Sequence, residues 1–165
     1  MMWPSLALLI FVTLQRLAEL FHARRNTLLL LARGGREVGA EHYPYMVMLH
    51  TLWLAGLWVA APGRPIGLFW LAVFVMLQLL RVWVLATLKD RWTTRIIVLP
   101  DAPLVHSGPY RFLNHPNYAI VIGEIAVLPL AFGLAYYALA FSLLNAAMLG
   151  VRIREENAAL VGNIL

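Results

Sequence analysis

The chain has 165 residues, of which 62% are hydrophobic and only 13% are charged, with a formal net charge of +5 and no cysteine. Soluble domains are about half apolar and about a quarter charged, so this composition predicts an integral membrane protein of one domain. The lack of cysteine excludes disulfides, thiolate metal sites and cysteine nucleophiles. The aromatic residues lie within apolar runs and are not interleaved with basic residues, so we expect no nucleic acid partner.

The first apolar segment covers roughly residues 3–22 and is long enough to cross a bilayer as a helix. It lacks the basic leading region and the small-residue cleavage site of a secretory signal peptide, and we interpret it as a retained span. Arg16 and Glu19 interrupt it near its end. Their spacing places both side chains on one face of a helix.

Two further spans are predicted at roughly residues 43–61 and 66–88, joined by the tight Pro/Gly turn APGRP at 61–65. Gln78 and Arg81 in the third span are spaced to share a helix face. A charge within a span is costly and is a candidate functional group. Snorkelling or a structural ion pair is the alternative interpretation of Arg81.

A polar segment at about 89–116 is longer than a minimal connection requires, which is typical of functional loops. The apolar run that follows, 117–151, is divided by Pro129 and Gly133 and therefore predicts a hairpin of two shorter helices. The remaining RIREENAALVGNIL predicts a surface amphipathic continuation. The two helices of the hairpin are expected at about 117–131 and 135–151.

Basic residues concentrate in three of the segments outside the spans. Five spans with the N-terminus outside place all three segments, and the C-terminus, on the cytoplasmic side, as the positive-inside rule requires. We therefore expect an all-α, multi-pass integral membrane protein that contacts membrane lipid. The basic residues are Arg24, Arg25, Arg33 and Arg36 after the first span, Lys89, Arg91, Arg95 and Arg111 after the third, and Arg152 and Arg154 in the tail.

The densest polar and aromatic stretch is HSGPYRFLNHPNY, residues 106–118, before the fourth span. Ser-Gly-Pro predicts a turn, and Pro116 suits the first turn of a helix, which leaves His115 just outside it. The free N–H groups and positive dipole of that helix end can receive a carboxylate. Tyr110 and Tyr118 provide rings for a flat base or a cation. The stretch therefore suits a ligand that has an aromatic part, a carboxylate and a positive charge, such as S-adenosylmethionine.

Three further charged residues lie at the fourth and fifth spans. Glu124 is about two turns into the fourth span, and Arg152 and Glu156 are one helical turn apart at the end of the fifth. Pairing of Glu124 with Arg81 as structural support, and an ordinary helix-end pair of Arg152 with Glu156, are the alternatives. No P-loop, GxSxG or GxGxxG motif is present.

The histidines do not form a recognisable metal motif. His42, His50, His106 and His115 make no HxH, HxxxH or HExxH pattern, and no carboxylate stands beside them at ligand spacing. We therefore expect no metal. His50 on an apolar helix is typical of a hydrogen-bonded interior histidine.

The run LVHSGPYRFLNHPNY, 104–118, followed about 30 residues later by RIREEN, resembles the isoprenylcysteine carboxyl methyltransferase family and its phospholipid-methyltransferase relatives. Their C-terminal halves carry a GxYxxxRHPxY pattern, a spanning hairpin and RxxxE(E). The match covers about 104–160. The segments at 78–100 and 41–50 look like the short bacterial branch, of which some members O-methylate alkylpyrones. Asn114 and Asn157 depart from the family pattern.

This resemblance implies a multi-pass enzyme of the bacterial cytoplasmic membrane that binds S-adenosylmethionine and methylates a carboxylate or acidic enol oxygen of a lipophilic acceptor. Residues 1–88 then form the acceptor side and 89–165 the cofactor side. A reductase or an N-methyltransferase on the same scaffold, and a non-catalytic membrane partner, are the alternatives. The resemblance assigns the cofactor to His106, Gly108, Tyr110, His115, Pro116, Tyr118 and Glu156.

An acceptor oxygen that is already anionic needs alignment with the methyl group and exclusion of water, but no strong base. We expect Arg152 or Arg81 to hold the oxyanion, and Glu124 or Glu156 to offset a neighbouring positive charge. If deprotonation is needed, His50 or His115 is the candidate base. The residues expected to line the acceptor side are Glu41, Tyr43, His50 and Trp92.

Overall fold

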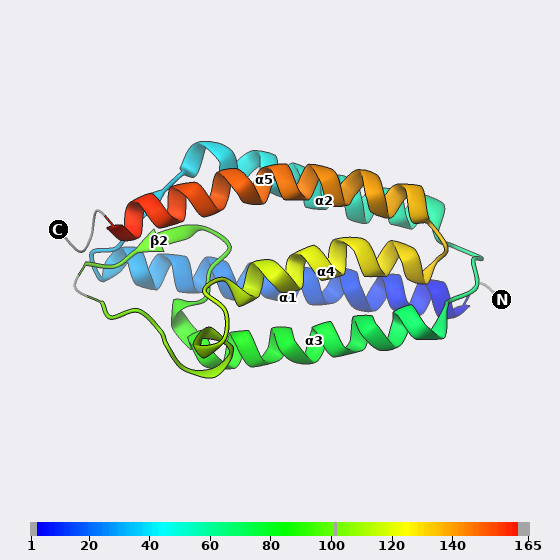
Figure 1. The fold of residues 1–165 in the computed structure, drawn as a ribbon, viewed down its shortest axis with the longest axis horizontal. Coiled ribbons are helices and arrows are strands. Elements are labelled where there is room, and N and C mark those ends of the chain that lie inside the picture. The colour runs from blue at the N-terminus through cyan, green and yellow to red at the C-terminus, as the bar shows by residue number, and fades with distance from the viewer. Residues whose placement is uncertain (1–2, 101, 162–165) are drawn as a thin grey trace.

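The computed structural model describes residues 3–100 and 102–161. The five described α-helices alternate in direction and lie side by side in an elongated bundle (Figure 1). The predicted helices are all present, and the predicted hairpin of the last two is formed. Their bounds are α1 Trp3–Ala32, α2 Tyr43–Ala60, α3 Leu68–Leu88, α4 Pro116–Ala131 and α5 Ala135–Val161.

Three of the described helical stretches, Trp3–Ala32, Leu68–Arg91 and Ala135–Ala159, are long and apolar enough to cross a membrane. α4 is a shorter apolar helix. Large apolar side chains face outward along the bundle, and Val59 remains 86% exposed and Phe21 77% exposed. A soluble protein would bury much of this surface, so these faces identify a membrane protein.

α1 was predicted to end near residue 22, but it continues to Ala32. It is therefore about 45 Å long at the rise of an α-helix. Leu, Ala and Arg are good helix formers and carry the helix past the apolar stretch. Gly34 follows two residues after Ala32 with φ +86°, and the next N–H, of Gly35, donates to Leu30 O at 2.9 Å. A left-handed glycine of this kind is a common helix terminator.

The chain is not entirely α-helical, which corrects the sequence-based prediction. β1 (Arg36–Val38) and β2 (Ile96–Val98) form an antiparallel two-stranded ribbon in which Arg36 faces Val98. An ion pair of 2.6 Å between Arg95 and Glu37 fastens it. Three-residue strands are too short to produce a recognisable alternation in sequence. Three short 3-10 turns complete the fold: η1 Ala40–His42, η2 Lys89–Arg91 and η3 Gly108–Arg111.

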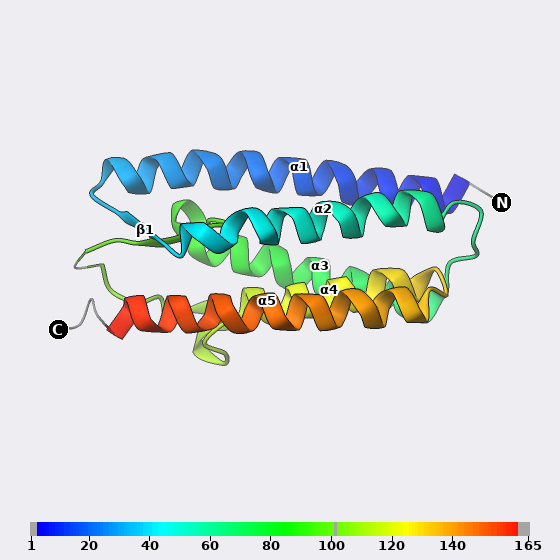
Figure 2. The same cartoon turned by 90° about the horizontal axis from the view of Figure 1, so that it is seen from above.

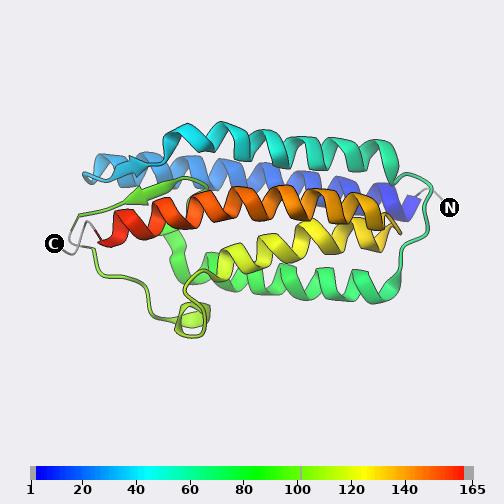
Figure 3. The ribbon, with the colours of Figure 1, turned by 45° about the horizontal axis from the view of Figure 1, so that its top comes forward.

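The predicted amphipathic continuation after the fifth span is present as the end of α5, which runs to Val161 with Arg154 and Glu155 exposed. The ribbon covers its other side. Ile96 and Val98 of β2 pack against Ala159, and Arg152 is only 5% exposed. Because β1 follows α1 and β2 follows α3, all three basic segments meet at one end of the bundle (Figures 2 and 3). Which side of a membrane this end faces stays a prediction.

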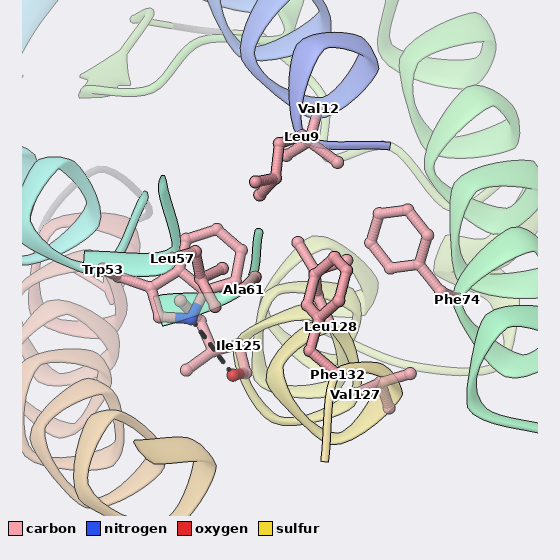
Figure 4. Packing of buried hydrophobic residues seen from close by; sticks show 10 residues of the cluster. All are labelled: Leu9, Val12, Trp53, Leu57, Ala61, Phe74, Ile125, Val127, Leu128 and Phe132. Carbon is pink, nitrogen blue, oxygen red and sulfur yellow. Dashed lines mark hydrogen bonds between the residues drawn. The ribbon is translucent and has the colours of Figure 1, made fainter. Parts of the chain in front are cut away.

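The main core lies toward the opposite end of the bundle, where α1, α2, α3 and α4 converge (Figure 4). Leu9, Trp53, Phe74 and Leu128 each come from a different helix and are almost fully buried. The indole N–H of Trp53 donates to the carbonyl of Ile125 at 3.3 Å. This packing holds α1, α2, α3 and α4 together at this end of the bundle.

Candidate functional site

Two cavities occupy the space between the core and the ribbon. The larger has a volume of about 430 Å³ and is enclosed mainly by apolar side chains of α1, α2, α4 and α5. The smaller has a volume of about 140 Å³ and lies among β2, η3, the start of α4 and the end of α5. The smaller cavity is markedly more polar, since Arg91, Arg95, His115 and Glu156 line it.

The two cavities share a wall, formed by Trp92, Thr93, Asn117, Tyr118 and Arg152. Tyr118 lies in the first turn of α4, and Arg152 lies on α5. The indole N–H of Trp92 points to the amide oxygen of Asn117 at 3.5 Å. Ligands in the two cavities would therefore meet at this wall.

Arg152 is held in the wall by three contacts. Its Nε donates to the Tyr118 hydroxyl at 2.8 Å, and one terminal nitrogen donates to the backbone carbonyl of Thr94 at 2.6 Å. The other terminal nitrogen lies 2.9 Å from the sulfur of Met46 on α2. A thioether is a weak acceptor, so this nitrogen keeps most of its capacity to bind a stronger one.

Tyr118 connects Arg152 to Glu156. Its hydroxyl donates to Oε2 of Glu156 at 2.5 Å, and its ring stacks on that of His115 with centroids 5.2 Å apart. Nδ1 of His115 lies 3.6 Å from the same oxygen. Among the described residues, Oε1 of Glu156 has no hydrogen-bond partner. We call Arg152, Tyr118, Glu156 and His115 the wall cluster.

Tyr110 of η3 also lines the smaller cavity. Burial, and then the nearby negative charge of Glu156, raise the pKa of the Tyr110 phenol to about 12. The neutral phenol is therefore favoured, and its O–H remains a donor at any physiological pH.

The other predicted cofactor residues lie around this cavity without lining it. Gly108 has φ +57°, and a side chain there would collide with Thr87. Pro116 is buried as the first residue of α4. His106 is exposed and lines neither cavity. Gly108 and Pro116 thus shape the backbone on either side of Tyr110 and His115.

Of the residues predicted for the acceptor side, Tyr43, His50 and Trp92 line the larger cavity. The hydroxyl of Tyr43 lies 3.0 Å from that of Thr94. The guanidinium of Arg95 stands 4.1 Å above the Tyr43 ring. The structure does not bring Glu41 to this group, because its side chain is exposed and lines neither cavity.

A second charged group, which we call the interior cluster, lies within the bundle and consists of Arg16, Glu19, Arg81 and Glu124. Glu124 is 1% exposed and pairs with both arginines, at 2.7 Å to Arg16 and more closely to Arg81. Glu19 also pairs with both, at 2.8 Å and 3.1 Å. Gln78 donates to Glu124 at 2.7 Å.

The interior cluster joins α1, α3 and α4 and has no net charge when all four groups are ionised. Arg16, Glu19 and Arg81 border the larger cavity, whereas Glu124 lines neither cavity. Sequence reasoning treated Arg16 and Glu19 only as an interruption of the first span. Opposite charges at one face of a span were the signal that they belong to a buried network.

Sequence reasoning also missed Met46, Thr94 and Asn117. Met46 and Thr94 contact Arg152, and Thr94 does so through its backbone carbonyl. A backbone acceptor leaves no trace in residue type, and a methionine on an apolar helix looks like ordinary packing. Asn117, between Pro116 and Tyr118, was within the quoted motif but had been given no role.

The sequence model of the "Isoprenylcysteine carboxyl methyltransferase (ICMT) family" matches residues 70–162, more than half of the chain. The chain belongs to this family. The match covers the wall cluster and the third to fifth helices. Membership points to a membrane methyltransferase, and it confirms the resemblance found in the sequence.

Two relatives extend the similarity beyond the family match. "Uncharacterized protein YpbQ" of Bacillus subtilis (strain 168) is 39% identical over 165 residues, covering 97% of this chain and 96% of its own. An "Uncharacterized protein" of Haemophilus influenzae is 25% identical over 142 residues, with 82% and 83% covered. No solved structure matches the chain significantly.

Proposed function

We propose that the protein is an S-adenosylmethionine-dependent O-methyltransferase that methylates a carboxylate or acidic enol oxygen of a lipophilic prenyl or alkyl acceptor. The observation that carries this proposal is the shared wall. A small polar cavity and a larger apolar cavity meet at Tyr118 and Arg152, so two unlike reactants can approach each other there. Family membership supports methyl transfer within a membrane.

The chemistry of the smaller cavity fits S-adenosylmethionine. Glu156 has one carboxylate oxygen available for a positive group, and Arg91 and Arg95 provide guanidinium groups for a carboxylate. Tyr110 and Trp92 provide aromatic surfaces for a base. When bound, the cofactor supplies an electrophilic methyl group.

Arg152 orients the acceptor oxygen in this proposal. Tyr118 and the Thr94 carbonyl fix two of its nitrogens, and the third, next to Met46, binds the anionic oxygen at the wall. A guanidinium held in this way reduces the freedom of the reacting atom, which is the main requirement for a displacement at a methyl group. No base is needed when the oxygen is already ionised.

The larger cavity suits the lipophilic part of the acceptor. Leu17 and Leu20 of α1 and Val47 of α2 line it and are also exposed on the outside of the bundle. The cavity therefore borders the surface between α1 and α2, where lipid is expected. A hydrocarbon chain can enter from the bilayer while its polar head reaches Arg152, and the apolar walls exclude water.

The interior cluster acts in this proposal as a positioning group. Both oxygens of Glu124 are already bonded to Arg16, Arg81 and Gln78. The three guanidinium nitrogens of Arg81 also donate hydrogen bonds to Glu19 and Glu124. The catalytic roles predicted for Arg81 and Glu124 thus become roles in holding α1, α3 and α4 around the larger cavity.

The test is calorimetric binding of S-adenosylhomocysteine to detergent-purified protein, followed by transfer of labelled methyl from S-adenosylmethionine to hydroxypyrones, fatty acids and prenyl-cysteines. We expect micromolar binding that Glu156→Gln weakens at least tenfold. Glu155→Gln is the matched control, since Glu155 is the exposed neighbour and lines neither cavity. A folded wild type that binds a nicotinamide cofactor instead would favour the reductase alternative.

A further inference from the structure

His50 presents an unused acceptor to the larger cavity. Its Nδ1 lies 2.8 Å from the carbonyl oxygen of Met46, one turn earlier on α2. A carbonyl oxygen can only accept, so Nδ1 carries the hydrogen of this bond. The cavity around the ring is lined mainly by apolar side chains, and burial there disfavours a charged imidazolium. The neighbouring interior cluster is balanced in charge, so it offers no unpaired carboxylate to offset such a charge. The ring is therefore neutral, with a lone pair on Nε2.

Within the described part of the chain, Nε2 of His50 has no hydrogen-bond partner. The other polar side chains near this level of the cavity have used their donors. The hydroxyl of Thr13 donates to Leu9 O and that of Thr51 to Val47 O, both at 2.8 Å. Trp58 donates its indole N–H to Thr13 at 3.0 Å. An unpaired acceptor in largely apolar surroundings is unfavourable, so a ligand that brings a donor is favoured.

The position of His50 relative to the wall is set by α2. Met46 contacts Arg152 at 2.9 Å, and His50 follows four residues later on the same face of the helix. The helical rise places His50 about 6 Å further from the wall toward the core. The cavity therefore has two polar levels, one at Arg152 and one at His50, with apolar walls around them.

We infer that the preferred acceptor carries a hydroxyl or N–H donor about one helical turn from its methylated oxygen, and that Nε2 of His50 accepts a hydrogen bond from this donor. The inference rests on the proposed function and narrows its substrate class. A plain hydrocarbon chain directly behind the reacting oxygen leaves Nε2 unpaired. His50 is thus a specificity-determining residue.

The test uses long-chain fatty acids that carry one hydroxyl at successive positions, the matching unsubstituted acid, and the corresponding methyl ethers. Binding is followed by the tryptophan fluorescence of the detergent-purified protein, because Trp53, Trp58 and Trp92 line the larger cavity. We expect one hydroxyl position to increase affinity about tenfold over the unsubstituted acid. Its methyl ether cannot donate and should lose this gain.

Two variants assign the effect to His50. His50→Gln retains a side-chain acceptor and should keep part of the preference for the hydroxyl. His50→Leu should remove the preference, so that it binds the hydroxylated and unsubstituted acids with equal affinity. Its circular dichroism spectrum and thermal unfolding, compared with those of the wild type, show that it is folded. A preference that survives in His50→Leu, or a wild type with no preference for any hydroxyl position, overturns the inference.

These measurements separate the inference from the proposed function, because they need neither the cofactor nor methyl transfer. A hydroxyl preference that depends on His50, without methylation of any acceptor, would support the donor site and contradict the methyltransferase proposal. Methylation that is equally fast for the hydroxylated and unsubstituted acids, with equal affinities, would support the proposed function and contradict the inference.

Discussion

The interior cluster and the wall cluster both contain arginine and glutamate. They differ in how many of the charged groups' oxygens and nitrogens remain without a strong hydrogen-bond partner. Both oxygens of Glu124 are bonded within the protein. In the wall cluster, Glu156 uses one oxygen, and one nitrogen of Arg152 meets only a thioether. Spare hydrogen-bonding capacity beside a cavity therefore distinguishes the group that we propose to be reactive from the one that we propose to be structural.

The two clusters also differ in their surroundings. The interior cluster sets two arginines against two glutamates, so it can remain in apolar surroundings without an outside partner. The wall cluster lies at the boundary between the apolar and polar cavities. In the proposed function, this boundary places a charged ligand on one side and a hydrocarbon chain on the other.

The largest expected effect comes from breaking the interior cluster. Glu124→Ala leaves the guanidiniums of Arg16 and Arg81 without their main partner, and we expect a loss of about 3 to 5 kcal/mol in unfolding free energy. The unfolding free energy is measured by titrating the detergent-purified protein with denaturant. Arg33→Ala is the control, since it breaks the exposed pair with Asp90 and should change little. Equal effects would contradict the assignment.

The second prediction concerns the wall cluster. Arg152→Lys cannot bind Tyr118, the Thr94 carbonyl and an acceptor oxygen together, because an ammonium lacks the planar fork. We expect kcat/KM for methyl transfer to fall about 100-fold, with unfolding free energy changed much less than by Glu124→Ala. Arg154→Lys is the matched control on the exposed side of α5. If Arg152→Lys lowered the unfolding free energy more than it slowed methyl transfer, Arg152 would be a structural residue like those of the interior cluster.

A smaller change tests the connection within the wall cluster. Tyr118→Phe removes the hydroxyl that links Arg152 to Glu156 but keeps the ring stacked on His115. We expect about a tenfold weaker affinity for S-adenosylhomocysteine, because Glu156 loses a donor that orients it. Tyr136→Phe, at a side chain that is 91% exposed, provides the baseline. Unchanged affinity would mean that Glu156 is held by other contacts.

The smallest expected effect is on the pH dependence of the unfolding free energy. Since burial raises the pKa of Tyr110 to about 12 from an unfolded value of about 10, its phenol contributes stability that is complete below about pH 10. This contribution is lost as the pH rises toward about 12. A series of unfolding curves across that window should show a decline that is shallower in Tyr110→Phe. Identical slopes would place Tyr110 in contact with water.

Much of the fold was predictable because it follows from apolar length and from turn residues. The Pro129–Gly133 division correctly separated α4 from α5, and APGRP separated α2 from α3. The end of α1 was wrong, because good helix formers continue the helix past the apolar stretch to Ala32. The helical continuation of α5 was predicted, but the packing of Ile96 and Val98 on Ala159 was not, because such a contact depends on tertiary structure.

For the site, residue type identified most of the charged residues, but it did not show which of them lie together in the wall cluster and which in the interior cluster. The i, i+4 spacing of Arg152 and Glu156 and the HPNY motif both led to the wall cluster. Arg81 and Glu124, assigned to the same chemistry, lie in the other cluster, because pairing between helices depends on three-dimensional packing. The roles of the individual residues stay predictions.

The ribbon of β1 and β2 has a consequence for how the chain is made. Arg36 pairs opposite Val98, and α2 and α3 lie between them in the sequence. The first strand must therefore stay unpaired until both helices and the second strand have been synthesised. Once the ribbon closes, it joins the loop after α1 to the loop after α3 at the same end of the bundle. Neither α2 nor α3 can then reverse its direction without breaking the ribbon.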